Sequence, residues 1–117
     1  MTKKIVVTGG TGRFGQILKE HKIKHKIFFP SKKELDILNP KKIEKYLKSK
    51  KPNILIHLAG LSRPMKMHDE NISKSIDLNI IGTANITKAC AKNHVKLIYF
   101  STNYVYPGTK GNYKETD

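Results

Sequence analysis

Residues 6–15 read VVTGGTGRFG, and this stretch decides the fold. It closes a short run rich in β-branched residues, which predicts a buried strand from about residue 3 to residue 8. The residues after the glycines place apolar side chains at helical spacing, so a helix is expected next. A glycine-rich turn between a strand and a helix is the setting in which protein backbones bind a pyrophosphate.

Three glycines in this turn each have a physical reason to be there. Gly9 allows a sharp turn after the strand, Gly12 lets the backbone approach a phosphate closely, and Gly15 lets the helix sit tightly on the strand. The helix N-terminus then offers unpaired N–H groups to the phosphates. The alternative is a glycine turn with no ligand. A Walker loop is excluded because no Gly-Lys-Ser/Thr follows.

The rest of the chain alternates apolar runs with helical patterns. Strands are predicted within residues 24–30, 52–60 and 95–102, and helices within residues 39–51 and about 69–93. Residues 34–38 could hold one more, very short strand. Asn39 is predicted to cap the second helix, and Gly82 to allow close packing of the third. Continuous apolar strands between helices indicate an α/β fold: a Rossmann-like, doubly wound parallel sheet of about five strands.

Composition describes a globular chain. Its 117 residues suit one domain, 1–117, with 38% hydrophobic and 27% charged residues. No apolar run approaches the roughly 20 residues of a membrane span, and the N-terminus lacks the pattern of a signal peptide. We therefore expect a cytoplasmic protein with no membrane partner.

The net charge of +14 suggests anionic partners, but only Arg13 and Arg63 are arginines among 23 cations. Base recognition favours arginine, so the sequence favours a solvated basic surface over nucleic-acid binding. Cys90 is the single cysteine, which excludes an internal disulfide and suits a buried apolar thiol. The five histidines lack ligand spacing, so no metal site is expected.

Several stretches together resemble the extended short-chain dehydrogenase/reductase superfamily. They are the G-x-x-G-x-x-G turn, IHLAG at 56–60, the helical pattern at 75–93 and the strand and loop at 98–117. SKKELDILNP at 31–40 and STNYVYPG at 101–108 are most similar to dTDP-4-dehydrorhamnose reductases and related nucleotide-sugar reductases. The resemblance covers the whole chain and implies a dinucleotide cofactor and a nucleotide-sugar substrate.

The resemblance also implies where the cofactor lies. The residues expected at the pyrophosphate are Gly9, Thr11, Gly12, Arg13 and Phe14, supported by Gly15. Leu58, Ala59 and Gly60 match the turn that passes the nicotinamide ribose. Where relatives carry an acidic residue for the adenosine ribose, this chain has Ser31, Lys32 and Lys33. A hydroxyl and cations suit a 2′-phosphate, which favours NADP(H) and leaves NAD open. The alternative is that these lysines only extend the basic surface.

Three further positions carry an expected role from the resemblance. Asp36 and Ile37 match the pair that contacts adenine, although Asp36 could instead be a turn or cap residue. Asn79 matches a buried asparagine that acts near the reaction or satisfies backbone groups. Thr102 matches the catalytic hydroxyl that hydrogen-bonds the substrate carbonyl.

The family's catalytic Tyr and Lys lie one helical turn apart. Tyr106 and Lys110 have that spacing, but Pro107 and Gly108 between them indicate a loop. The true pair is therefore expected beyond residue 117, together with the later strands and a small C-terminal substrate domain. The last strand of the shortened sheet would be an exposed edge, which leaves an oligomer open.

The sequence thus predicts the NADP(H)-binding portion of a nucleotide-sugar reductase that is inactive alone, so its standing as an enzyme stays open. Two alternatives remain. One is a fragment of an NAD-dependent nucleotide-sugar epimerase or dehydratase, and the other is a non-catalytic dinucleotide-binding module.

Overall fold

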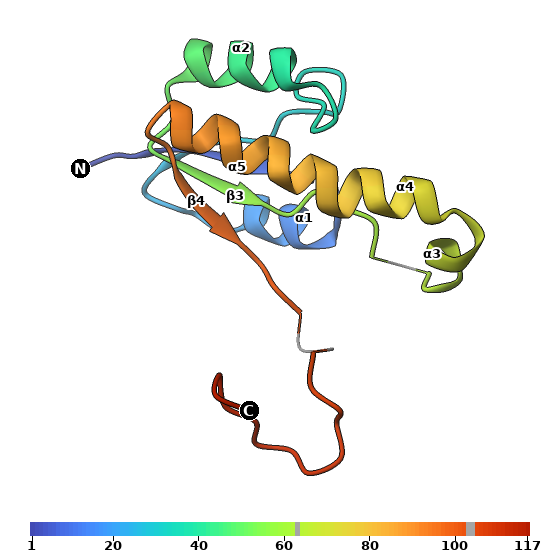
Figure 1. Cartoon of the computed structure of the whole chain (residues 1–117). Coiled ribbons are helices and arrows are strands. Elements are labelled where there is room, and N and C mark those ends of the chain that lie inside the picture. Colours follow the sequence, from blue (N-terminus) through green and yellow to red (C-terminus); the bar gives the residue numbers. More distant parts are fainter. Residues whose placement is uncertain (63, 103–104) are drawn as a thin grey trace.

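A parallel sheet between two layers of helices forms the body of the protein in the computed structural model, which describes residues 1–62, 64–102 and 105–117 (Figure 1). Within these residues the strands are β1 (Lys4–Thr8), β2 (Lys26–Phe28), β3 (Ile54–His57) and β4 (Lys96–Tyr99). They lie in the order β2-β1-β3-β4, and each neighbouring pair is parallel. The predicted α/β fold is confirmed.

The helices divide between the two faces of this sheet. Helix α1 (Arg13–Glu20) covers one face, while α2 (Pro40–Lys50) and α5 (Gly82–Lys92) lie together on the other (Figure 1). Two short helices, α3 (Lys66–Glu70) and α4 (Ile72–Ile76), and a π-helical segment, η1 (Asp77–Ile81), lead into α5.

The core lies between the sheet and the pair α2 and α5. Val6 and Leu55, partners across β1 and β3, are fully buried against Ile43, Leu47 and Ile86 of the two helices. These residues form one contiguous cluster, so burial of apolar surface holds the helices on this face.

Helix α2 begins as the sequence predicts. The Asn39 side chain accepts a hydrogen bond from the Lys42 backbone N–H at 3.1 Å, and Pro40 is the first helical residue.

The prediction for the single cysteine is also confirmed: Cys90 is buried in the core, and burial raises the pKa of its thiol to about 11.

The very short strand proposed within residues 34–38 is wrong, so the described sheet has four strands and not about five. The segment forms successive turns instead, because the backbone N–H of Leu35 donates to the Ser31 carbonyl and that of Asn39 to the Asp36 carbonyl. Leu35 and Ile37 are buried in the core from these turns, which explains their apolar pattern without a strand.

The predicted long helix of residues 69–93 is interrupted near its start. Asn71 leaves the helical conformation, at φ −139° and ψ 71°, and its side chain caps α4 by accepting from the Lys74 N–H at 3.0 Å. The helical path is continuous only from Ile72 onward, and it widens to π-helical turns in η1 before α5.

The prediction that Gly82 permits close packing is confirmed. A Cβ on Gly82 would lie 2.6 Å from Cδ1 of Ile37, so the glycine makes room for the turn that replaces the expected strand. The Asn85 side chain ties the same turn to α5 by donating to the Ile37 carbonyl at 3.0 Å.

Strand β4 is an end strand of the sheet, as expected. It pairs with β3; Ile98 and Tyr99 at its end and Phe100 directly after it are 38%, 54% and 52% exposed. The loop predicted after it includes residues 103 and 104, which lie outside the described residues. In the part of the chain that the structure describes, no helix is long and apolar enough to span a membrane.

Truncating Leu47 should destabilise the fold strongly. Its side chain is 1% exposed in the core, and we expect Leu47→Ala to lower the free energy of unfolding by about 2–5 kcal/mol. Chemical denaturation measures the loss. Ile72→Ala, at a side chain that is 62% exposed, is the control and should change stability by less than about 0.5 kcal/mol. Equal losses in the two variants would contradict the assigned core.

Candidate functional site

The glycine turn has the geometry expected from its sequence. Gly9 has φ 68°, which a side chain rarely tolerates, and its carbonyl accepts from the Gly12 N–H at 3.0 Å. A Cβ on Gly15 would collide with the backbone of Gly10. The predicted need for a glycine at position 15 is therefore confirmed. The backbone that lies against Gly15 is that of Gly10 in the turn, whereas the sequence predicted the strand.

Helix α1 starts directly from this turn. Gly12 is its N-cap residue and supplies no side chain to bond the first N–H groups of the helix. Such N–H groups and the positive end of the helix dipole favour an anion at this position. In the part of the chain that the structure describes, the first turn of this helix carries no acidic side chain that would repel an anion.

A cleft of about 630 Å³ opens beside the turn, at the carboxyl ends of β1 and β3. Most of the predicted cofactor residues line it: Gly9, Thr11, Gly12, Arg13, Phe14, Lys32, Asp36, Ile37, Leu58, Ala59 and Gly60. Its walls are the glycine turn, the segment 30–37 and the loop 58–62, which are distant in sequence. A volume of this size is in the range of small-molecule and cofactor sites.

Two predicted residues near the cleft have structural contacts. The Ser31 hydroxyl accepts from the Glu34 N–H at 3.3 Å, and the Glu34 carboxylate accepts from the Ser31 N–H at 3.0 Å. Asp36 lines the cleft and also accepts from the Leu38 N–H at 2.9 Å. The turn role that the sequence left open for Asp36 is therefore present, on the same side chain that faces the cleft.

Asn79 lies outside this first cleft and holds one of its walls. The Asn79 Oδ1 accepts from the Leu61 N–H at 2.7 Å, and its Nδ2 donates to the Leu61 carbonyl at 2.8 Å. A Cβ on Gly60 would lie 2.8 Å from that Oδ1, so the glycine leaves room for the amide. The backbone role that the sequence left open for Asn79 is present.

A second cleft, of about 530 Å³, lies on the other side of the loop 58–62. Thr102, the predicted catalytic hydroxyl, lines it with Asn79, Thr83 and Tyr99. Both clefts share the loop from Leu58 to Ser62, which therefore separates the predicted cofactor residues from Thr102.

Sequence reasoning missed a buried hydrogen-bond chain beneath both clefts. The Thr8 hydroxyl accepts from the N–H groups of Leu58 at 3.2 Å and Ala59 at 3.3 Å. Its own proton is then available to His57 Nδ1 at 2.7 Å. His57 Nε2 correspondingly donates to the Thr83 hydroxyl at 3.0 Å. The only signal was a histidine inside the apolar run NILIHLAG.

Burial keeps the His57 imidazole neutral. The side chain is 1% exposed, and desolvation lowers its pKa from 6.5 to about 4. The network requires a neutral ring, because a protonated Nδ1 would have no free lone pair to accept the hydrogen bond from the Thr8 hydroxyl.

Sequence reasoning also missed a cation at the first cleft, beside the glycine turn. Lys74, in α4, lines it together with the predicted Arg13 and Lys32. Three positive side chains around one cleft favour a polyanionic ligand. Lys74 could not be recognised beforehand because it belongs to a helix that reaches the cleft only through the fold.

Tyr106 and Lys110 lie in a loop, as predicted. The Tyr106 hydroxyl donates to the Lys114 carbonyl at 3.1 Å, and its ring stacks on Tyr113 with the centroids 4.9 Å apart. The Lys110 ammonium lies over the Tyr113 ring, 5.9 Å from its centroid. The two side chains are therefore not arranged on a helical turn as a catalytic pair would be.

Comparison with known proteins gives the family. Residues 3–117 match the family described as the RmlD substrate binding domain. The chain belongs to this family. A solved RmlD-family structure, the dTDP-4-dehydrorhamnose reductase of Bacillus anthracis in complex with NADP, superposes with a TM-score of 0.86 at 28% identity. The alignment covers 94% of this chain and 40% of that one, and it confirms the expected resemblance.

Curated relatives extend the picture. The GDP-L-colitose synthase of Yersinia pseudotuberculosis is 37% identical over 114 residues, which are 89% of this chain and 35% of that protein. The methionine adenosyltransferase 2 subunit beta of Xenopus laevis is 28% identical over 123 residues, or 97% of this chain and 36% of that protein. The chain therefore spans little more than a third of the curated relatives that it matches.

The buried histidine predicts a pH-dependent stability. Because the folded state lowers the pKa of His57 below its unfolded value of 6.5, the neutral ring stabilises the fold fully above that pH. The contribution falls as the pH drops from about 6.5 toward about 4. Between about pH 7 and about pH 5 we expect the free energy of unfolding to fall by about 2 kcal/mol.

Chemical denaturation across this pH range tests the assignment. His57→Gln removes the titrating group, so the fall should largely disappear in this variant. The exposed His21 provides the control, because His21→Gln should keep the full pH dependence. A stability of the unsubstituted chain that does not change between these pH values would contradict the buried neutral imidazole.

Proposed function

We propose that residues 1–117 form the NADP(H)-binding domain of a nucleotide-sugar reductase that acts on a keto-sugar. The observation that carries this proposal is the cleft beside the glycine turn, where Gly9, Gly12 and the start of α1 meet the loop 58–62. The NADP-bound reductase from Bacillus anthracis, with a TM-score of 0.86, supports the same cofactor for this chain.

The glycine turn would hold the pyrophosphate. A Cβ on Gly12 would lie 3.2 Å from the Gly9 carbonyl oxygen, so a side chain there would crowd the turn itself. Gly12 also lines the cleft, where the missing side chain would leave the backbone open to a phosphate. Arg13 and Phe14, at the N-terminus of α1, line the same cleft, and the backbone N–H groups of this first turn would donate to phosphate oxygens.

Lys32 and Arg13 would select the phosphorylated cofactor. Both line the cleft, and the segment 31–33 has no carboxylate to bind the ribose hydroxyls of NAD. The Ser31 hydroxyl is engaged with Glu34, so the cations carry the preference more than the serine does.

The second cleft would receive the sugar. Bound NADPH would supply the hydride for reduction of the keto carbon. The Thr102 hydroxyl would donate to the substrate carbonyl oxygen and stabilise the negative charge that develops there. Asn79 would position the loop between cofactor and sugar through its two bonds to Leu61.

A second candidate is a dinucleotide-binding module without catalysis of its own. The observation that favours it is the likeness to a methionine adenosyltransferase 2 subunit beta over 97% of this chain. In that case the cofactor cleft would bind its ligand and the second cleft would bind no sugar.

Titration calorimetry with the two cofactors tests the binding. We expect NADPH to bind with a micromolar dissociation constant. NADH should bind more weakly, because it lacks the 2′-phosphate that would pair with Lys32 and Arg13. Lys32→Ala should weaken NADPH binding by about tenfold and leave NADH binding nearly unchanged. Lys22→Ala, an exposed lysine outside the cleft, is the control. No binding of either cofactor would contradict the proposal.

The 117-residue chain alone should not reduce a dTDP-keto-sugar. A Tyr proton donor held one helical turn from a Lys is expected for the reaction, and Tyr106 and Lys110 lie in a loop. Loss of NADPH absorbance in the presence of substrate is the measurement. Turnover above the rate without protein would contradict our interpretation of Tyr106 and Lys110.

A further inference from the structure

The two helices on the outer face of the sheet border a groove of their own. This α2–α5 groove has a volume of about 910 Å³ and shares no lining residue with either cleft described above. It therefore needs an explanation separate from cofactor or sugar binding.

Lysines form both rims of the α2–α5 groove. Lys41, Lys45 and Lys48 follow one another at spacings of four and three residues, which places them on one side of α2. Lys88 and Lys92 are one helical turn apart on α5 and face them across the groove. All five side chains are exposed.

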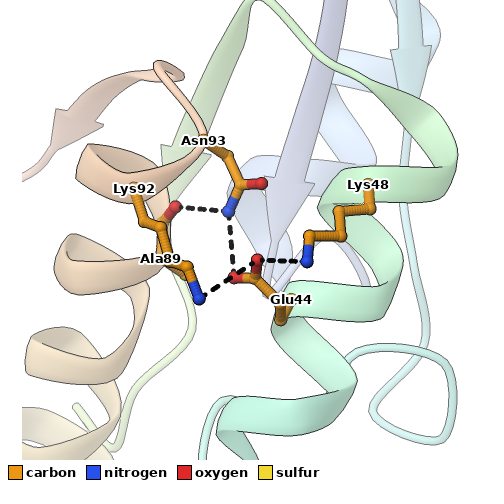
Figure 2. A network of polar contacts seen from close by, with 5 residues as sticks. All are labelled: Glu44, Lys48, Ala89, Lys92 and Asn93. Carbon is orange, nitrogen blue, oxygen red and sulfur yellow. Dashed lines mark hydrogen bonds and ion pairs between the residues drawn. The ribbon is translucent and has the colours of Figure 1, made fainter.

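One carboxylate lies between the two rims. Glu44 Oε1 is 3.1 Å from the Lys48 ammonium and 3.7 Å from that of Lys92, and its Oε2 accepts from the Asn93 side chain at 3.0 Å (Figure 2). The Asn93 hydrogen bond, followed by Lys48, lowers the pKa of this carboxyl. Glu44 therefore stays ionised, and its contacts join α2 to Lys92 and Asn93 at the C-terminal end of α5.

This arrangement leaves a net positive charge in the groove. Glu44 neutralises about one of the five cations, and no acidic side chain in the described parts of the chain forms an ion pair with Lys41, Lys45 or Lys88. The lining also includes Pro40, Ala89 and Ala91, so the groove is partly apolar.

We propose that the α2–α5 groove docks an acidic segment of a partner protein, one that carries carboxylates toward both rims and apolar side chains toward the alanines. Opposite charge on the two partners would steer the encounter and fix the orientation of the segment.

The lining favours an acidic protein segment over a nucleic acid. Among the described residues, no arginine and no aromatic side chain lines the groove, so this lining offers neither the bidentate phosphate grip nor the stacking surface that nucleic-acid sites use. Apolar contacts from Pro40 and the alanines suit aliphatic side chains of a peptide instead.

Fluorescence anisotropy with a labelled peptide of the repeat Glu-Glu-Leu-Glu tests the proposal on the full 117-residue chain. We expect saturable binding near physiological salt that weakens as the salt concentration rises. Lys45→Glu/Lys88→Glu reverses one cation on each rim, leaves the Glu44 ion pairs intact, and should weaken binding by at least about tenfold. Lys22→Glu/Lys24→Glu makes the same change in net charge outside the groove and should weaken binding by less than about twofold.

Thermal melts followed by circular dichroism show whether each variant folds, and the milder Lys45→Ala/Lys88→Ala provides the same test should the charge reversal unfold the chain. Absence of saturable peptide binding would overturn the proposal, as would equal losses in the groove and control variants. A labelled single-stranded DNA that binds more tightly than the peptide, and loses affinity in the groove variant, would identify a nucleic-acid site and also overturn it.

Discussion

The hydroxyl of Thr8 is the contact on which both clefts depend. It lies at the carboxyl end of β1, accepts from two successive N–H groups after β3, and donates to the buried His57. Through its Nε2, His57 in turn hydrogen-bonds the Thr83 hydroxyl at the start of α5. Two strands and a helix are thereby joined at the edge of the sheet where ligands of parallel sheets bind. Such a network is stable only while every buried group has its partner, which is why a neutral imidazole is essential.

The loop 58–62 gains its position from this network and from Asn79. Thr8 holds the beginning of the loop, and the Asn79 amide holds Leu61 through both of its polar atoms. Because the loop forms a wall of each cleft, the same contacts set the separation between the two clefts. A substitution at Asn79 would therefore affect both clefts without touching a ligand in the first.

Helices α2 and α5 are held by a separate set of contacts. Gly82 leaves space for the Ile37 side chain against α5. Glu44 joins α2 to the C-terminal end of α5 through its ion pairs with Lys48 and Lys92. Apolar burial holds these helices on the sheet. The basic composition, which read as a general solvated surface in the sequence, is in part concentrated on one groove.

The sequence by itself determined the α/β class and the strand–glycine–helix unit, because these depend on local spacing and on backbone limits at glycine. Its resemblance to a known family added most of the residues that line the first cleft. It also assigned Tyr106 and Lys110 to a loop, since Pro107 and Gly108 act locally. Only the tertiary structure decided that residues 34–38 are turns, because the space that receives the Ile37 side chain lies against Gly82 of α5, a residue distant in sequence. It alone brought Lys74 to the cleft and His57 between two threonines, since these contacts join residues that no sequence period relates.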